Sequence, residues 1–201
     1  ANLIIDIGHK QGESGDVTQA FAQIVNGTEV EGYIETYPEY VKFCDPGKKV
    51  KMYFITQLSK KPNGHGSFVD TVQQVSESKT EGINNGLYLT FSMEQDEVLE
   101  IQTGLSYTSI ENARLNLKSE SKGKSFDRVR KESKEIWNNK LNKIVVEGGQ
   151  EKDRVKFYTG LYHALLGRGL ANDVNGDYPL IDNKIGKTPT DETGAPKYNH
   201  Y

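Results

Sequence analysis

Five residues near the C-terminal end alternate oxygen-bearing side chains in the manner of a calcium-binding loop. They are Asp173, Asn175 and Asp177, with Val174 and Gly176 between them. An EF-hand loop places a glycine directly after the third oxygen ligand and a glutamate six positions further on. Here Gly176 precedes Asp177, and no glutamate follows at that distance. A turn held by Asp and Asn hydrogen bonds is therefore favoured over a calcium site formed by this segment alone.

The other reactive side chains form no recognisable catalytic or metal-binding pattern. The histidines His9, His65, His163 and His200 are scattered without metal-ligand spacing. His163, inside a helical pattern, is expected to be hydrogen-bonded and partly buried. The 28 acidic residues guarantee carboxylate pairs by chance, and their spacing singles out no acid and base for glycoside hydrolysis. The sequence therefore assigns no catalytic residue and no metal ligand.

Composition excludes several classes of protein. Lys and Arg total 25 against 28 Asp and Glu, so the net charge of -3 argues against a nucleic-acid binder or a protein of anionic membranes. One cysteine excludes an intramolecular disulfide framework. No apolar run approaches the ~20 residues of a membrane helix. A hydrophobic content of 35% predicts a thin core that packs against something else.

The first hundred residues predict β-structure. Short apolar or alternating runs cover residues 3–7, 21–25, 28–34, 50–56, 87–91 and 98–103. The Asn26-Gly27 pair between two of these runs predicts a hairpin with a type I′ turn. Strands at this spacing, without helices between them, indicate an antiparallel sandwich.

Three helical patterns follow. Thr108 and Glu111 have the spacing of a capping box at the start of the first helix. Ser125 is the expected cap of the second, whose apolar stripe ends near Trp137 and predicts a strut between domains. A third helix is expected over residues 151–166. After Leu170 about thirty residues show no regular pattern, a length that is unusual for a loop without function.

Several blocks, in order, resemble glycoside hydrolase family 92, the bacterial exo-acting α-mannosidases. They are GLSYTSIENARLNL at 104–117, FDRVR at 126–130, IVVEGG at 144–149, KFYTGLYHALL at 156–166 and DVNGDY at 173–178. The last block lies where the family carries an Asp-x-Asn-Gly-x-Tyr segment. The β half is similar to the family's N-terminal domain more loosely.

The resemblance implies a fold that is mainly β with α. Residues 1–107 are expected to be part of an N-terminal antiparallel β-sandwich, residues 108–149 a helical linker, and residues 150–201 the incomplete start of an (α/α)6 barrel. On this view the chain is an interior fragment, which packs against the remainder of its own chain and is inactive alone.

The resemblance also implies an activity. The parent protein is expected to remove terminal α-linked mannose from glycans by an inverting, calcium-dependent mechanism, with an acid, a base and calcium ligands outside this fragment. The aromatic-rich end of the chain, Tyr198, His200 and Tyr201, is expected to contact the sugar, although an ordinary connecting loop remains an alternative. A periplasmic, cell-surface or secreted location is implied.

Two other functions remain open. One is a carbohydrate-binding or scaffolding sandwich with no chemistry of its own, which would bind mannose or mannan as an isolated chain. The other is a phosphorylase with the same architecture, which would need phosphate for turnover.

Overall fold

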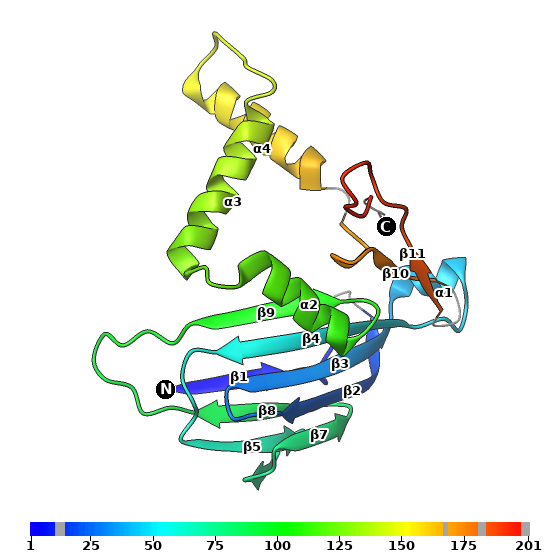
Figure 1. The fold of residues 1–201 in the computed structure, drawn as a ribbon, viewed down its shortest axis with the longest axis vertical. Coiled ribbons are helices and arrows are strands. Elements are labelled where there is room, and N and C mark those ends of the chain that lie inside the picture. The colour runs from blue at the N-terminus through cyan, green and yellow to red at the C-terminus, as the bar shows by residue number, and fades with distance from the viewer. Residues whose placement is uncertain (11–14, 167–168, 181–183, 198–201) are drawn as a thin grey trace.

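The computed structural model describes residues 1–10, 15–166, 169–180 and 184–197 (Figure 1). Two antiparallel sheets dominate it. One has four strands in the order β1 (Asn2–Asp6), β8 (Asn85–Thr90), β5 (Gly64–Val69) and β6 (Val72–Val75). The other has five strands in the order β7 (Lys79–Gly82), β2 (Asp16–Ile24), β3 (Glu29–Tyr37), β4 (Val50–Leu58) and β9 (Ile101–Ser106). The predicted antiparallel sandwich is confirmed.

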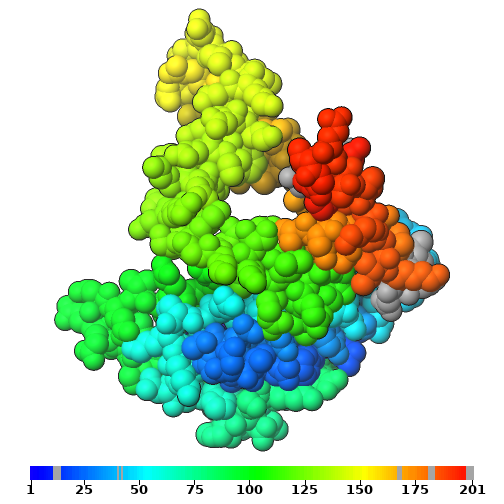
Figure 2. Space-filling model, in the orientation of Figure 1, coloured from blue at the N-terminus to red at the C-terminus, as the bar shows by residue number. Residues whose placement is uncertain are grey.

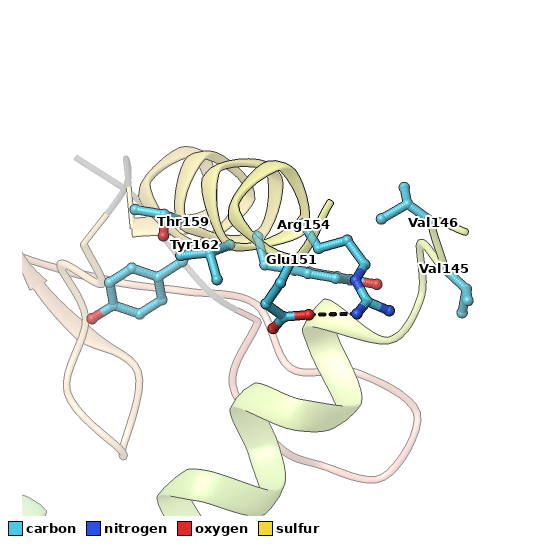
Figure 3. A pocket seen from close by; sticks show the side chains of 8 residues that line it. Val145, Val146, Glu151, Arg154, Thr159 and Tyr162 are labelled. Atoms are coloured by element: carbon cyan, nitrogen blue, oxygen red, sulfur yellow. Dashed lines mark hydrogen bonds and ion pairs between the residues drawn. The ribbon is translucent and has the colours of Figure 1, made fainter. Parts of the chain in front are cut away.

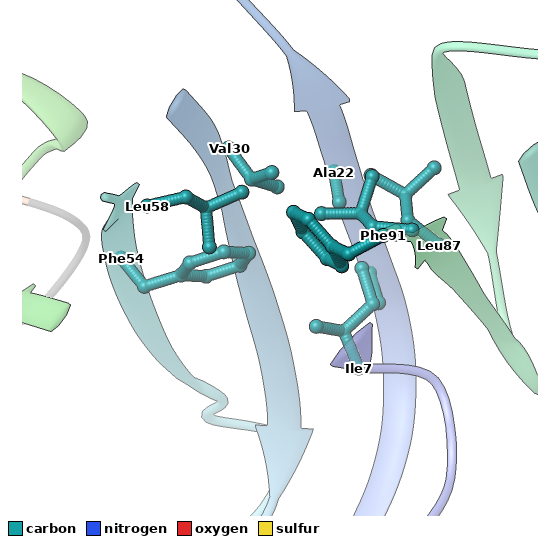
Figure 4. Packing of buried hydrophobic residues seen from close by; sticks show 9 residues of the cluster. Ile7, Ala22, Val30, Phe54, Leu58, Leu87 and Phe91 are labelled. Atoms are coloured by element: carbon teal, nitrogen blue, oxygen red, sulfur yellow. The ribbon is translucent and has the colours of Figure 1, made fainter. Parts of the chain in front are cut away.

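The core lies between the two sheets. Val30 and Leu87 are fully buried, and Phe54, Leu58 and Phe91 are nearly so (Figure 4). These residues face each other because side chains alternate along each strand, so that one face of each sheet is apolar. Each fully buried leucine stabilises the fold by about 1.5–3 kcal/mol relative to an exposed one.

The hairpin between β2 and β3 is present, but its turn is not type I′. Ile24 pairs with Val30, and the amide of Val25 donates to the carbonyl of Glu29 at 2.9 Å, so three residues form the loop. Only Gly27 in this loop has a positive φ, of 80°. A type I′ turn needs positive φ at both central positions, which Asn26 does not adopt here.

Helix α2 (Ile110–Ser121) covers part of the outer face of the five-stranded sheet (Figure 1). Its Ala113 and Leu117 pack on Ile55 of β4. The N-cap is Ser109, whose hydroxyl accepts a hydrogen bond from the amide of Asn112 at 3.0 Å. The prediction of Thr108 as the cap is therefore wrong by one residue. The hydroxyl of Thr108 donates instead to Asp173, as described below.

Helices α3 (Phe126–Leu141) and α4 (Glu151–Leu166) form an arm that extends away from the sandwich (Figure 1). Ser125 caps α3 as predicted, accepting from the amide of Arg128 at 3.4 Å. The two helices meet where the rings of Trp137 and Tyr162 lie 4.6 Å apart. Neither helix has a buried residue, so the sandwich does not bury the apolar stripe of α3. His163, expected to be partly buried, is exposed.

The last described segment is not without structure, contrary to expectation. Strands β10 (Asp177–Pro179) and β11 (Ile185–Lys187) pair as an antiparallel hairpin.

Elsewhere a short helix, α1 (Glu39–Cys44), links β3 and β4. Figure 2 shows the arm and residues 171–180 and 184–197 rising on opposite sides of an opening above α2. None of the described helices is long and apolar enough to span a bilayer.

Candidate functional site

The segment that resembles a calcium loop begins at Asp173, whose carboxylate is almost completely buried, with 3% of the residue exposed. Its Oδ2 accepts hydrogen bonds from the hydroxyls of Ser106 at 2.9 Å and Thr108 at 2.5 Å. Its Oδ1 accepts from the amide of Asn116 at 2.7 Å. Three neutral donors thus replace the water that this carboxylate loses on burial.

The segment ends at Asp177, whose carboxylate is also fully hydrogen-bonded. Its Oδ2 accepts from the side-chain amides of Asn112 and Asn175, each at 2.9 Å. Its Oδ1 accepts from the ammonium of Lys187 at 2.8 Å. The hydrogen bond from Lys187, followed by that from Asn112, holds the pKa of Asp177 below its ordinary value.

Strand β9 and helix α2 position these partners. Asn112 and Asn116 lie one turn apart on α2, so both amides project from the same side of that helix. Ser106 ends β9, and its hydroxyl also accepts from the backbone amide of Thr108 at 2.9 Å. We call this set of contacts the Asp173–Asp177 junction. It ties the segment of residues 171–197 to α2 and β9.

The oxygens of the junction do not fit a calcium ion. Both oxygens of Asp173 and of Asp177 already accept hydrogen bonds from N–H or O–H donors. The Oδ1 of Asn175 accepts from the backbone amide of Asp177 at 3.0 Å, which is the Asx hydrogen bond expected of a turn. Within the described ranges, no group of three His, Cys, Asp or Glu side chains could hold a metal ion.

The residues predicted to contact sugar, Tyr198, His200 and Tyr201, lie outside the described residues. The segment leading to them is described as far as residue 197. In that segment the amide of Thr188 donates to the carbonyl of Gly176 at 2.8 Å, which joins the end of the β10–β11 hairpin back to the junction.

An open groove of about 730 Å³ lies along α4. Its walls are the start of α4 and the loop before it, with Val145, Val146 and Tyr162 among the lining side chains (Figure 3). Its one lining carboxylate, Glu151, is ion-paired with Arg154. An inverting glycosidase needs two carboxyl groups roughly 6.5–9.5 Å apart across the sugar. The groove has one lining carboxylate, Glu151, and Arg154 neutralises its charge.

Two carboxylates, those of Glu29 and Glu31, lie under α2. Arg114 donates to Glu29 and to Glu31, each at 2.6 Å. The hydrogen bonds to Glu29 and Glu31 raise the pKa of the guanidinium. Both carboxylates are committed to one cation, so this set is a partly buried ion-pair network that holds α2 on β3.

Sequence reasoning singled out Asp173, Asn175 and Asp177 but missed the residues that bind them. Ser106, Thr108, Asn112 and Asn116 precede the segment by 57 to 67 residues. The one signal in the sequence is the pair of asparagines four residues apart on a predicted helix, which places two polar amides on one face.

Two family models match the chain. The glycosyl hydrolase family 92 N-terminal domain matches residues 1–106, and the glycosyl hydrolase family 92 catalytic domain matches residues 112–201. No curated protein sequence matches it.

Solved structures with a similar fold carry the same family name. The family GH92 α-mannosidase BT3965 from Bacteroides thetaiotaomicron, in complex with mannoimidazole, is similar over 98% of this chain, with a TM-score of 0.82 and 22% identity. The family GH92 inverting mannosidase BT2199 from the same organism is similar over 94%, with a TM-score of 0.78 and 20% identity. The chain spans 25% of each of these two structures. Because the two family models together match almost its whole length, the chain belongs to glycosyl hydrolase family 92.

Proposed function

We propose that this chain is part of an α-mannosidase that removes terminal α-linked mannose from glycans by inverting, calcium-dependent hydrolysis. Within it, residues 1–107 belong to the β-sandwich, residues 108–149 to the helical linker and residues 150–201 to the start of the helical catalytic domain. The substrate is an α-mannose-containing glycan, and the location is periplasmic, cell-surface or secreted.

One observation carries the proposal. The N-terminal and catalytic family models match the two halves of the chain in order, on either side of the start of α2. Solved structures named as mannosidases share the fold across both halves, which adds support to the substrate class.

The chain's own contribution to this activity is to position the two halves. The Asp173–Asp177 junction binds the segment after α4 to β9 and α2, so the path toward Tyr198, His200 and Tyr201 starts from a fixed point. Tyrosine rings stack on the C–H faces of sugars, and on this proposal the three residues contact the mannose.

The described residues supply neither the acid–base pair nor a vacant set of oxygen ligands, so no chemical step is assigned to any of them. In an inverting reaction, one carboxylic acid protonates the departing oxygen while a carboxylate activates water on the opposite face of the sugar. We infer that the 201-residue chain alone does not hydrolyse α-mannosides.

The test uses the full reading frame that encodes this chain. The purified product should hydrolyse an aryl α-mannoside and release β-mannose first, as followed by NMR, and a chelator should abolish turnover until calcium is restored. A requirement for phosphate would indicate a phosphorylase instead. Release of α-mannose first would contradict inversion, and activity unaffected by chelation would contradict calcium dependence.

The contact proposed for the C-terminal aromatic residues has its own test in the same protein. Tyr198→Ala and Tyr201→Ala should each raise KM for a mannoside by about tenfold, the loss of one good stacking contact. Tyr178→Ala, in the hairpin before them, serves as a control for loss of a nearby tyrosine. Unchanged KM in both C-terminal variants would favour a plain connecting loop.

A further inference from the structure

The outer face of the four-stranded sheet carries two aromatic rings beside glycines. Residues directly opposite each other in antiparallel strands share a face. Phe68 of β5 is opposite Gly86 of β8, and Tyr88 of β8 is opposite Gly66 of β5. Leu87 and Leu89, the two neighbours of Tyr88 in β8, point into the core. Phe68 and Tyr88 therefore both stand on the solvent side of the sheet.

Both rings lie across the neighbouring strand. A Cβ atom added at Gly66 would meet the Tyr88 ring at 2.4 Å, and one added at Gly86 would meet the Phe68 ring at 2.4 Å. The rings thus occupy the space that side chains at these two positions would fill. Each ring has its inner side on backbone, and each residue is only partly buried, so an outer side remains accessible.

These rings border a groove of about 330 Å³ with a polar rim. Asp6, Asp70 and Gln73 line it, and no Lys, Arg or His does. Oδ1 of Asp6 lies 2.8 Å from Nδ1 of His9. Among the described residues, none makes a hydrogen bond to the side chain of Asp70 or of Gln73.

The rim is held in place by a tight turn. Asp70 adopts a φ of 51° in the two-residue connection between β5 and β6, and its amide donates to the carbonyl of Asn84 at 2.8 Å. A carboxylate on a fixed turn beside a fixed ring needs little ordering when a ligand binds, which favours binding.

The aromatic residues on the other sheet do not offer such a surface. Phe21 stacks on Tyr33 at 5.7 Å, and the ammonium groups of Lys79 and Lys51 lie over these two rings at 5.3 and 4.3 Å. Among the residues that the structure describes, no cation or other ring lies against Phe68 or Tyr88. Of these two pairs of rings on the sheets, only Phe68 and Tyr88 lie beside carboxylates and without a cation over them.

We propose that this groove binds a neutral pyranoside, with the apolar C–H face of the sugar on the rings of Phe68 and Tyr88. Its hydroxyl groups donate hydrogen bonds to Asp70 and Asp6, and exchange hydrogen bonds with the amide of Gln73. The absence of a lining cation disfavours an anionic ligand, and the volume is at the lower end of the range for small-molecule pockets. The proposal rests on the residues of this groove and not on the proposed hydrolytic activity.

The test is an NMR titration of the ¹⁵N-labelled 201-residue chain with mannobiose, cellobiose and maltose. At least one disaccharide should shift the amide resonances of β5, β6 and β8, with saturation in the millimolar range. Trp137 lies on the arm, far from this sheet along the chain, and its indole resonance should not move.

Two variants separate binding from folding. Phe68→Leu keeps an apolar side chain over Gly86 but removes the ring, and should weaken binding about tenfold. Asp70→Gly should also weaken binding about tenfold by removing a charged acceptor, while glycine suits the positive φ and keeps the turn. A purely structural Asp70 would tolerate this change.

The matched control is Asp96→Gly. Asp96 is also a non-glycine residue at positive φ, of 64°, and does not line the groove. This variant should bind as the parent chain does. The proposal is overturned if none of the three disaccharides shifts these amides, if the Phe68 and Asp70 variants bind unchanged, or if the shifts depend on protein concentration and so report self-association.

Discussion

At the scale of single residues, the Asp173–Asp177 junction depends most on the side chain of Asp173. Asp173→Ala should remove the acceptor for Ser106, Thr108 and Asn116 at a site that is 3% exposed. Leaving buried donors without partners costs about 1–3 kcal/mol per group, and re-pairing of Ser106 with Thr108 offsets part of it. We expect the local opening free energy of residues 173–180 and 184–188 to fall by about 2–4 kcal/mol.

Hydrogen exchange at two amides measures this effect. The amide of Val174 donates to Oδ1 of Asn116, and that of Thr188 donates to Gly176. Both should exchange faster in Asp173→Ala, while amides of the sandwich core, such as that of Leu87, keep their protection. Equal loss of protection in the core would mean that Asp173 stabilises the whole chain rather than the junction.

Asp177 gives the junction a pH dependence. Its pKa in the folded chain lies below the ordinary value of 3.8, first because of the hydrogen bond from Lys187. A depressed carboxyl pKa stabilises the fold fully above the ordinary value, and this stabilisation is lost as pH falls through the lower folded pKa. The junction should therefore stay docked at neutral pH and loosen only in strong acid.

Lys187→Met tests this cause. An NMR titration of the Asp177 carboxyl should show its pKa rising toward 3.8 in this variant, because the largest lowering contribution is gone. Lys184→Met is the control, since Lys184 is in the same hairpin and contributes its backbone carbonyl to Leu180. An equal rise in both variants would indicate general charge screening instead of the specific contact.

The residues of the junction show what can be read from sequence at this scale. The alternation of Asp173, Asn175 and Asp177 predicts a turn, and the Asx hydrogen bond to Asn175 is local and so predictable. The donors to Asp173 come from residues 57 or more positions away, and local patterns carry no information about such partners. Folding, rather than spacing, decides that these oxygens accept hydrogen bonds.

At the scale of elements, the packing of α2 on β9 depends on Gly104. A Cβ atom there would lie 2.4 Å from the carbonyl oxygen of Ala113 and 2.6 Å from Cβ of Leu117. Gly104→Ala should push α2 off the sheet and lower the free energy of unfolding by about 1–3 kcal/mol, the usual cost of overpacking. Urea unfolding followed by circular dichroism measures the change.

Gly160→Ala is the matched control for this substitution. Gly160 lies inside α4, and an added Cβ would meet nothing within 4 Å. Alanine should stabilise that helix by about 0.5–1 kcal/mol through its higher propensity. If both variants lose stability, the effect of Gly104→Ala does not come from crowding against α2.

The elements that sequence predicts best are those whose apolar residues repeat regularly. The cap at Ser125 and the helix at Glu151–Leu166 are confirmed, as are strands near 50–56 and 87–91. Strands β5 to β7 were missed because GHGSFV, VQQV and KTEG are short and largely polar. The pairing of β1 with β8, over eighty residues apart, follows from burial of both apolar faces and not from any local signal.

At the scale of the whole molecule, apolar surface is distributed unevenly. The sandwich and α2 have buried clusters, whereas α3 and α4 have no buried residue and expose Phe126, Ile136 and Leu165. Helix stability in proteins comes mainly from packing an apolar face. The arm should therefore be much less stable than the sandwich, unless another surface covers it.

The single tryptophan makes this difference measurable. Trp137 of α3 lies against Tyr162 of α4, so its fluorescence reports on the arm, while the amides of Leu87 and Leu89 report on the sandwich core. In urea, the Trp137 emission should shift to the red at a lower concentration than that at which the core amides lose protection. This separation is expected because unfolding is cooperative only within parts that share a core. Tyr162→Ala should move the fluorescence transition to still lower urea and leave the core unaffected. Coincident transitions for both probes would show that the arm and the sandwich unfold as one unit, and that the contacts of α2 and the Asp173–Asp177 junction transmit stability to the arm.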